Sequence, residues 1–323
     1  MKIGIDMMGG DFAPLEAVLG LQHFLSTGSK NTTLFCIGDE EQVKPLLALH
    51  AIDETKVVTV HAPQVIEMHE HPTKALKEKQ QSSIAVGFYM LATGKIDAFI
   101  SAGNTGAMLV GAMYSIKAIE GVLRPTISTV VPKLNGGTGL LLDVGLNADC
   151  KPENLNQFAI LGSLYAKEIL GITDPKVGLL NVGEEEGKGN LLAQATYPLL
   201  KENSRINFIG NVEGRDVLMD KADVIVCEGF TGNILLKMAE SLYDIAKSRN
   251  LHQDSYMSRF HYENYGGTPV LGVNKPVIIG HGISNGTAFS NMIALAEKMV
   301  ASNICREMVE SFKETSTVDE LSS

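Results

Sequence analysis

The chain has 323 residues, of which 45% are hydrophobic and 20% are charged, and it carries a formal net charge of −10 at pH 7. This length and composition are typical of a globular protein with a sizeable core, and the low aromatic content favours an α/β class over an all-β one. The negative charge argues against broad binding to nucleic acid or to an anionic membrane surface.

Cysteine usage and hydropathy indicate an untargeted cytoplasmic protein. The four cysteines stand far apart and form no C-x-x-C pair, so the sequence favours neither a zinc site nor a redox motif. Asp6 interrupts the N-terminal apolar run, where a signal peptide would need an unbroken one. No run approaches the roughly 18 apolar residues that a membrane span needs.

Short apolar runs alternate with segments of helical periodicity along the chain. We expect strands at 2–6, 33–38, 56–60, 97–101, 126–131, 139–144, 176–182, 206–210, 223–229 and 277–282. We expect helices near 14–26, 40–49, 83–93, 105–118, 153–170, 190–202, 214–220, 231–248 and 285–312. This succession predicts parallel βαβ units in a three-layer α/β/α sandwich.

We expect a single α/β domain over 1–323, because the sequence contains no repeat and no low-complexity tract. The mixed polar and aromatic stretch within 238–265 predicts no strand and is a candidate for a protruding segment. The polar end, 313–323, predicts a frayed tail.

The loops after the predicted strands are rich in glycine and asparagine, and ligands of open α/β sheets collect at these strand ends. A tight turn with a helix cap would explain any one of the loops. Seven loops of this kind together favour a ligand site built from backbone amides, and "GNTG" (103–106) and "TGN" (231–233) each place Thr and Asn at a predicted helix start, which attracts anions.

The loop "NVGEEEGKGN" (181–190) looks like a phosphate loop but does not match the nucleotide-binding pattern. Val182 stands where the first glycine of that pattern belongs, and Gly189 replaces the hydroxyl residue that binds magnesium. Two interpretations of Lys188 remain open at this point: a phosphate ligand, or a solvated lysine paired with Glu184, Glu185 or Glu186.

The whole chain resembles bacterial phosphate acyltransferases of the PlsX type. The segments that carry the resemblance are 3–14, 79–107, 141–162, 179–190, 210–237 and 265–288. The resemblance implies an isocitrate/isopropylmalate-dehydrogenase-like and phosphotransacetylase-like fold, and a homodimer that moves a fatty acyl group from acyl carrier protein to inorganic phosphate. It also implies that the acyl phosphate feeds a membrane glycerol-3-phosphate acyltransferase at the start of phospholipid synthesis.

The resemblance assigns catalysis to Lys188 and Asn233. Lys188 would contact phosphate or the developing oxyanion, with Glu184 turned inward as its partner, and Asn233 would contact the oxyanion or the substrate carbonyl; a helix N-cap is the plainer interpretation of Asn233. Further candidates for substrate binding are Asp6, Gly9, Gly10, Asp11, Asn104, Thr105, Gly106, Asp143, Asn147, Asn181, Thr231, Gly232 and His281. Phosphate is already a nucleophile and a thiolate leaves readily, so we expect no metal and no cofactor.

Several alternatives stay open. A β-decarboxylating dehydrogenase has the same fold but would need arginines and an aspartate cluster, and a carrier-protein-binding scaffold would need no catalysis. Cys150 or Cys227 would serve as a nucleophile in a two-step mechanism, although neither has a cationic neighbour in sequence. His281 is either a proton donor to the leaving thiolate or a structural histidine. The segment 237–262 is shorter than the helical hairpin usual in the family, which leaves membrane association open.

Overall fold

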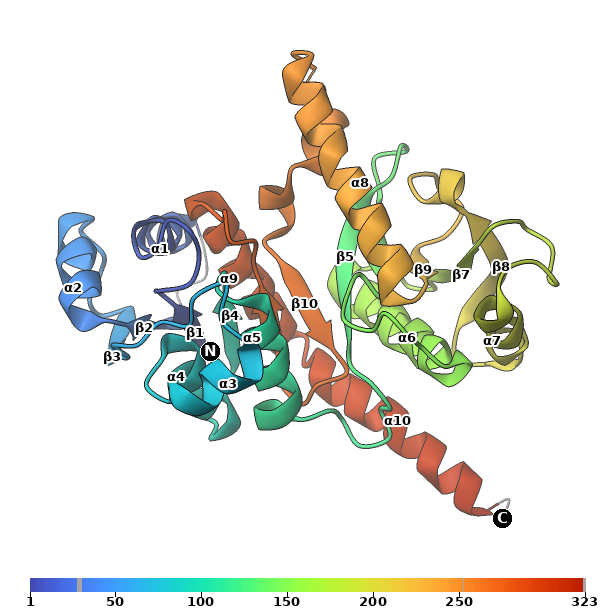
Figure 1. The fold of residues 1–323 in the computed structure, drawn as a ribbon, viewed down its shortest axis with the longest axis horizontal. Coiled ribbons are helices and arrows are strands. Elements are labelled where there is room, and N and C mark those ends of the chain that lie inside the picture. Colours follow the sequence, from blue (N-terminus) through green and yellow to red (C-terminus); the bar gives the residue numbers. More distant parts are fainter. Residues whose placement is uncertain (28–30, 252, 322–323) are drawn as a thin grey trace. The chain divides into compact units, whose positions relative to one another are not determined.

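The chain divides into two compact units in this computed structural model, which describes residues 1–27, 31–251 and 253–321, with side chains up to residue 313 (Figure 1). Unit 1 comprises Met1–Ala118 and Tyr262–Cys305, and unit 2 comprises Ile119–His261 and Arg306–Ser323. Each unit has its own strands and buried core, whereas the sequence led us to expect one domain.

Unit 1 contains a mostly parallel set of strands in the order β3-β2-β1-β4-β11-β10. The strands are β1 Lys2–Asp6, β2 Thr33–Gly38, β3 Val57–His61, β4 Ala98–Ser101, β10 Thr268–Leu271 and β11 Val277–Ile279. Only the β10–β11 pair is antiparallel among these strands. Runs such as "KIGID" and "AFIS" are buried almost throughout, as expected for strands covered on both faces.

Helices pack on the strands of unit 1. They are α1 Leu15–Thr27, α2 Glu40–Leu49, α3 Pro72–Glu78, α4 Ser83–Ala92, α5 Thr105–Gly111 and α9 Gly286–Ala301. The helices α1 and α9 lie against each other at close range, because Gly20 leaves no side chain between them and a Cβ there would meet the Cβ of Phe289 at 2.3 Å. A π-helical turn, Ala112–Ile116, continues α5.

Unit 2 contains strands in the order β5-β6-β9-β7-β8. They are β5 Thr126–Pro132, β6 Thr138–Leu142, β7 Lys176–Asn181, β8 Asn207–Glu213 and β9 Val224–Val226, of which β5 and β6 form an antiparallel pair. The helices are α6 Pro152–Tyr165, α7 Leu191–Glu202, α8 Gly229–Ser248 and α10 Ile304–Leu321, and α10 begins with two residues of unit 1. The parallel strands β6, β9 and β7 end side by side, which brings the loops after them to one edge.

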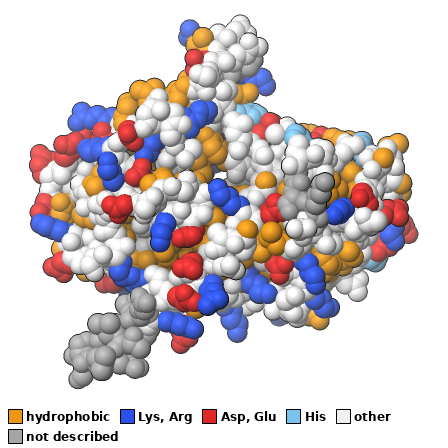
Figure 2. Space-filling model, turned by 180° about the vertical axis from the view of Figure 1, so that it is seen from behind, with side chains coloured by type: hydrophobic (Ala, Val, Ile, Leu, Met, Phe, Trp, Pro, Cys, Tyr) orange, Lys and Arg blue, Asp and Glu red, His pale blue; other side chains and the backbone are white. Residues whose placement is uncertain are grey.

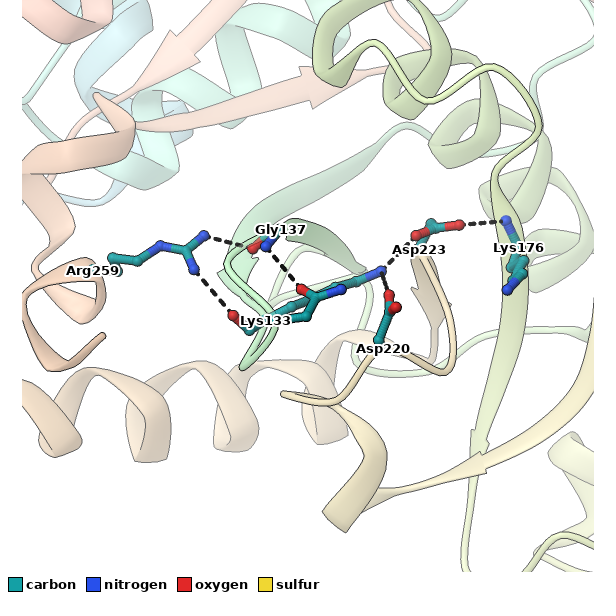
Figure 3. A network of polar contacts seen from close by, with 7 residues as sticks. Lys133, Gly137, Lys176, Asp220, Asp223 and Arg259 are labelled. Atoms are coloured by element: carbon teal, nitrogen blue, oxygen red, sulfur yellow. Dashed lines mark hydrogen bonds and ion pairs between the residues drawn. The ribbon is translucent and has the colours of Figure 1, made fainter. Parts of the chain in front are cut away.

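Arg259 holds the segment after α8 against the turn between β5 and β6, and the buried Lys133 of that turn pairs with two aspartates (Figure 3). Arg259, in the 3-10 turn Met257–Phe260, donates to the backbone carbonyls of Lys133 and Gly137, in the turn between β5 and β6. The Lys133 side chain is only 3% exposed and contacts Asp223 and Asp220. The Arg259 bonds hold the segment on the β5–β6 hairpin, and the C-terminal part of α8 extends away from the strands of unit 2 (Figure 1).

The differences from the predicted elements have local causes. The expected helix 285–312 is two helices, because Asn303 adopts a left-handed φ of 54° between α9 and α10. The helix expected near 214–220 is only the 3-10 turn Gly214–Asp216. The sequence analysis missed α3 and β10, which are short, and the two antiparallel pairs depart from the purely parallel pattern expected.

The expected frayed tail, 313–323, falls partly on α10, which runs to Leu321, and residues 322–323 lie outside the described part. Within the ranges that the structure describes, no helix combines the length and the apolar character needed to cross a membrane.

Candidate active site

The loop after β6 is built around the carboxylate of Asp143. One carboxylate oxygen accepts the backbone N–H groups of Gly145 and Leu146, each at 2.8 Å. The other accepts the backbone N–H of Asn147 at 3.2 Å and its side-chain amide at 2.6 Å, and that amide also donates to the carbonyl of Pro125. Burial raises the pKa of Asp143 above its usual 3.8. Asp143 and Asn147 were predicted to bind substrate. In the structure, their side chains bond to each other and to nearby backbone groups.

The first turn of α8 lies directly on this loop. A Cβ on Gly229 would meet the backbone of Asn147 at 2.8 Å, and one on Gly232 would meet the carbonyl oxygen of Asp143 at 1.8 Å, so both positions require glycine. Gly232 was predicted to bind substrate, but this contact gives it a packing role.

The N-cap of α8 is Glu228, which the sequence analysis missed. Its carboxylate accepts both the backbone N–H of Thr231, at 2.8 Å, and the Thr231 hydroxyl. An anionic cap already offsets the positive end of the helix, so the start of α8 is a weaker anion site than "TGN" predicted. Asn233 is the fifth helical residue rather than the cap; its side chain is exposed beside Gly145, at 3.3 Å from a Cβ built there.

The loop after β7 is organised by Asn181 and Asn190. The Asn181 side chain accepts from the N–H of Val182 at 2.8 Å and donates to the carbonyl of Lys188 at 3.0 Å, which closes the loop. Gly189 has a φ of 100°, and a Cβ there would meet the Asn181 side chain at 2.3 Å, which explains the glycine beside the lysine. Asn190 caps α7 by accepting from the N–H of Ala193. The predicted start of this helix is confirmed.

Lys188 itself is exposed, and its ammonium contacts no acidic side chain within the described ranges. The expected pairing with Glu184 is wrong, because Glu184 pairs with Lys221 at 2.6 Å and Lys221 also pairs with Asp216 at 2.8 Å. Glu186 pairs with Lys201 on α7 at 3.0 Å. Other lysines thus hold two of the three glutamates, and Lys188 keeps its charge available.

The start of α7 adds two open donors beside this lysine. The backbone N–H groups of Leu191 and Leu192 have no acceptor in the part of the chain that the structure describes. The first N–H groups of a helix carry partial positive charge and are ready to bind an anion. Residues 188–192 therefore offer an anion one exposed ammonium and two backbone N–H donors.

A pocket of about 360 Å³ opens next to this group. It is bounded by the ends of β7 and β9 and by residues of α6, α7 and α8, and it includes the predicted site residues Asn181 and Thr231. Most of its wall is aliphatic, a feature that the sequence analysis did not single out. The leucine pairs at the end of β7 and at the start of α7 were the sequence signal for this aliphatic wall.

Two cysteines lie close to this loop cluster, and both have a raised thiol pKa. Burial raises the pKa of Cys150 to about 12, with Asp143 adding to the effect. Burial, followed by Glu228 and Asp143, also raises the pKa of Cys227. A nucleophilic cysteine needs a lowered pKa, so these environments oppose the two-step alternative.

The remaining predicted residues lie in unit 1, around the ends of β1 and β4. Asp6 is fully buried, accepts from the N–H of Met8 at 2.9 Å and from the hydroxyl of Ser101 at 2.6 Å, and has a pKa raised by burial. Gly9 lies against Asp6 and Gly103, and a Cβ would meet them at 2.4 and 2.6 Å. Gly10 needs its positive φ of 104°. These residues hold the β1 loop against the β4 loop.

The loop after β4 contains a second structural asparagine. The Asn104 side chain caps α5 by accepting from Ala107 and donates to the carbonyls of Glu67, Met68 and Glu70. Gly106 lies against Pro72, which a Cβ would meet at 2.3 Å. The predicted residues with exposed or half-exposed side chains in unit 1 are Asp11, Thr105 and His281, and the His281 ring packs edge-on against Tyr262.

Comparison with known proteins places the chain in a family. Residues 1–307 match the family model described as fatty acid synthesis protein. Phosphate acyltransferase from Dictyoglomus turgidum is 43% identical over 96% of this chain and 97% of its own length, and that from Dictyoglomus thermophilum is 44% identical over the same shares. EutD phosphotransacetylase from Staphylococcus aureus has a similar fold, with a TM-score of 0.65 at 18% identity over 93% of this chain and 94% of that one.

The fold similarity confirms the predicted phosphotransacetylase-like α/β architecture. The family likeness supports neither the dehydrogenase nor the non-catalytic scaffold. The chain belongs to the fatty acid synthesis protein family and, within it, to the phosphate acyltransferases.

Proposed function

We propose that this acyltransferase moves a fatty acyl group from the thioester of acyl carrier protein to inorganic phosphate. A phosphate oxygen attacks the thioester carbonyl, the new C–O bond forms, and the C–S bond breaks to release the carrier thiolate, which takes up a proton from the medium. The product is an acyl phosphate. The reaction needs a positioned phosphate, donors for the oxyanion and shelter from water.

The observation that carries the proposal is the ammonium of Lys188, which has no acidic partner among the described residues, together with the open amides of Leu191 and Leu192 a few residues further along the same loop. This group offers a full positive charge and two N–H donors to one anion, which is the arrangement that phosphate prefers. Asn233 lies on the neighbouring helix and supplies an exposed amide for the substrate carbonyl. We place phosphate at Lys188 and assign the role of oxyanion donor to Asn233.

Direct transfer fits this site better than an acyl-enzyme. The Cys227 thiol is 4% exposed and has a raised pKa, so it stays protonated at neutral pH. Phosphate already carries negative charge and needs no such activation.

Replacing Lys188 with Ala tests the proposal. Removing one donor to a developing oxyanion usually lowers kcat by about 10²–10³; because Lys188 is exposed, we expect a loss near the lower end. The matched control is Lys201→Ala, which removes an exposed lysine that pairs with Glu186 of the same loop. The measurement is acyl phosphate formation from acyl carrier protein thioester at saturating phosphate. Equal rates in the two variants would remove Lys188 from the mechanism.

Docking of the acidic carrier protein would use exposed cations. Lys79 and Arg259 are engaged by Glu70 and by backbone carbonyls, which leaves Lys74 and Lys77 on α3 with Lys247 and Arg249 at the end of α8. Figure 2 shows basic side chains interspersed with acidic ones over one face, so steering would be local. Charge reversal of either pair should raise the KM for the carrier protein at low salt; an unchanged KM would exclude that pair.

The resemblance further supports a cytoplasmic homodimer whose product passes to a membrane glycerol-3-phosphate acyltransferase. The apolar side chains of α9 and of the first part of α10, such as Met292, Ile293 and Met308, are buried within the protomer, so the proposed dimer rests on the resemblance alone. Peripheral contact with the membrane would follow from the hand-over of an acyl phosphate. Light scattering that gives a monomer mass at micromolar concentration would rule out the dimer.

A further inference from the structure

The pocket beside the Lys188 loop has walls made of aliphatic side chains from four elements. Leu155 of α6 and Leu179 of β7 are almost fully buried and form its deep part. Leu235 of α8 lies half-buried in its wall. The buried apolar surfaces give the cavity an interior suited to an alkyl group.

The mouth of the pocket is apolar as well. Val182 is 79% exposed and Ile234 is 52% exposed, although both are aliphatic and border a concave surface. Single exposed apolar side chains are common on protein surfaces, but apolar side chains grouped around a cavity are typical of ligand-binding sites.

The side-chain oxygens of the asparagines and of the glutamate in the lining already accept hydrogen bonds. The side-chain oxygens of Asn181 and Asn190 accept backbone N–H groups, and the Glu228 carboxylate accepts from Thr231. A small polar ligand would find few free acceptors inside, and binding it would cost desolvation without new hydrogen bonds. The occupant that fits is therefore apolar.

We propose that this pocket binds the alkyl chain of the acyl substrate, with the thioester carbonyl at the mouth, where Val182 of the Lys188 loop and Ile234 of α8 border the pocket. The proposal rests on the proposed function, which supplies an acyl group beside the phosphate. The pocket volume of about 360 Å³ corresponds to about a dozen groups of water size, at about 30 Å³ each, so the pocket holds a medium length of chain.

Two substitutions that narrow the pocket test this assignment. Leu235→Trp places a larger side chain in the pocket wall and reduces the pocket volume. Ile234→Trp narrows the mouth of the pocket, at an exposed position where a larger side chain fits without strain. The matched control is Met238→Trp, one turn further along α8, where the side chain is 64% exposed and does not line the pocket. The measurement is kcat/KM for hexadecanoyl and butanoyl thioesters of acyl carrier protein, together with calorimetric binding of dodecanoate.

We expect the ratio of long-chain to short-chain kcat/KM to fall about tenfold in at least one pocket variant, because the larger side chain takes up space that the long alkyl chain would fill. The ratio should stay unchanged in Met238→Trp. An unchanged ratio in two folded pocket variants would overturn the pocket assignment while leaving acyl transfer intact. If the wild-type protein binds dodecanoate and the pocket variants do not, the pocket assignment is supported, whether or not thioesters are turned over. Absence of turnover in the wild-type protein would contradict only the proposed function. Failure of the wild-type protein to bind dodecanoate would contradict the pocket.

Discussion

The loops that follow β6 and β7 look alike in sequence, yet they use their polar residues in opposite ways. In the β6 loop, Asp143 is fully buried and its carboxylate accepts four hydrogen bonds from Gly145, Leu146 and Asn147. In the β7 loop, Lys188 is exposed and contacts no acidic partner in the described ranges. One loop is therefore scaffold, and the other presents charge to a ligand. A polar residue at a strand end indicates a site only when its bonding groups are left open.

Replacing Asp143 with Ala should have the largest effect on stability. The change leaves four donors without an acceptor in a buried loop, and we expect the free energy of unfolding to fall by about 3 kcal/mol or more. Urea unfolding at neutral pH measures this loss. A decrease below about 1 kcal/mol would mean that water replaces the carboxylate and that the loop is not scaffold.

Asp143→Asn is the control that keeps the shape, and it predicts a difference in pH dependence. Burial raises the native pKa of Asp143 above the usual 3.8, so the native state holds this proton when the unfolded chain has lost it. Raising the pH from 3.8 to the native pKa therefore lowers the unfolding free energy of the wild-type protein, and the loss stays constant above that value. The Asn variant has no titrating carboxyl at this position. The unfolding free energy of the variant minus that of the wild type should therefore become more positive as the pH rises. Parallel stability curves would contradict the assignment.

Truncation of Glu184 should have the smallest effect. Its side chain is 60% exposed and pairs with Lys221, and exposed pairs contribute only about 0.2–1 kcal/mol. Glu184→Ala should lower the unfolding free energy by less than about 1 kcal/mol and change kcat far less than Lys188→Ala does. A loss of kcat as large as that of Lys188→Ala would restore Glu184 as the partner of the lysine.

The sequence predicted which loops meet at the sheet edge, because apolar runs and glycine-rich turns are local signals. It did not predict which side chains turn inward. Whether the carboxylate of Asp143 meets its own loop depends on the turn that Gly145 allows, and whether Glu184 meets Lys188 depends on Lys221, which is 37 residues away. The sequence analysis missed Glu228 as the N-cap of α8 because "TGN", which begins three residues later, also contains typical cap residues. The apolar pocket combines residues of α6, of the β7–α7 stretch and of α8, which are distant in the chain.

The account depends most on the claim that the β7 loop, through Lys188, binds phosphate. Calorimetric titration of inorganic phosphate into the wild-type protein, Lys188→Ala and Lys201→Ala tests it most directly. We predict that wild-type protein and Lys201→Ala bind phosphate alike, and that Lys188→Ala binds it at least about tenfold more weakly, since a charge-assisted hydrogen bond contributes about 1.5–3 kcal/mol. Equal phosphate affinity in all three folded proteins would contradict the claim.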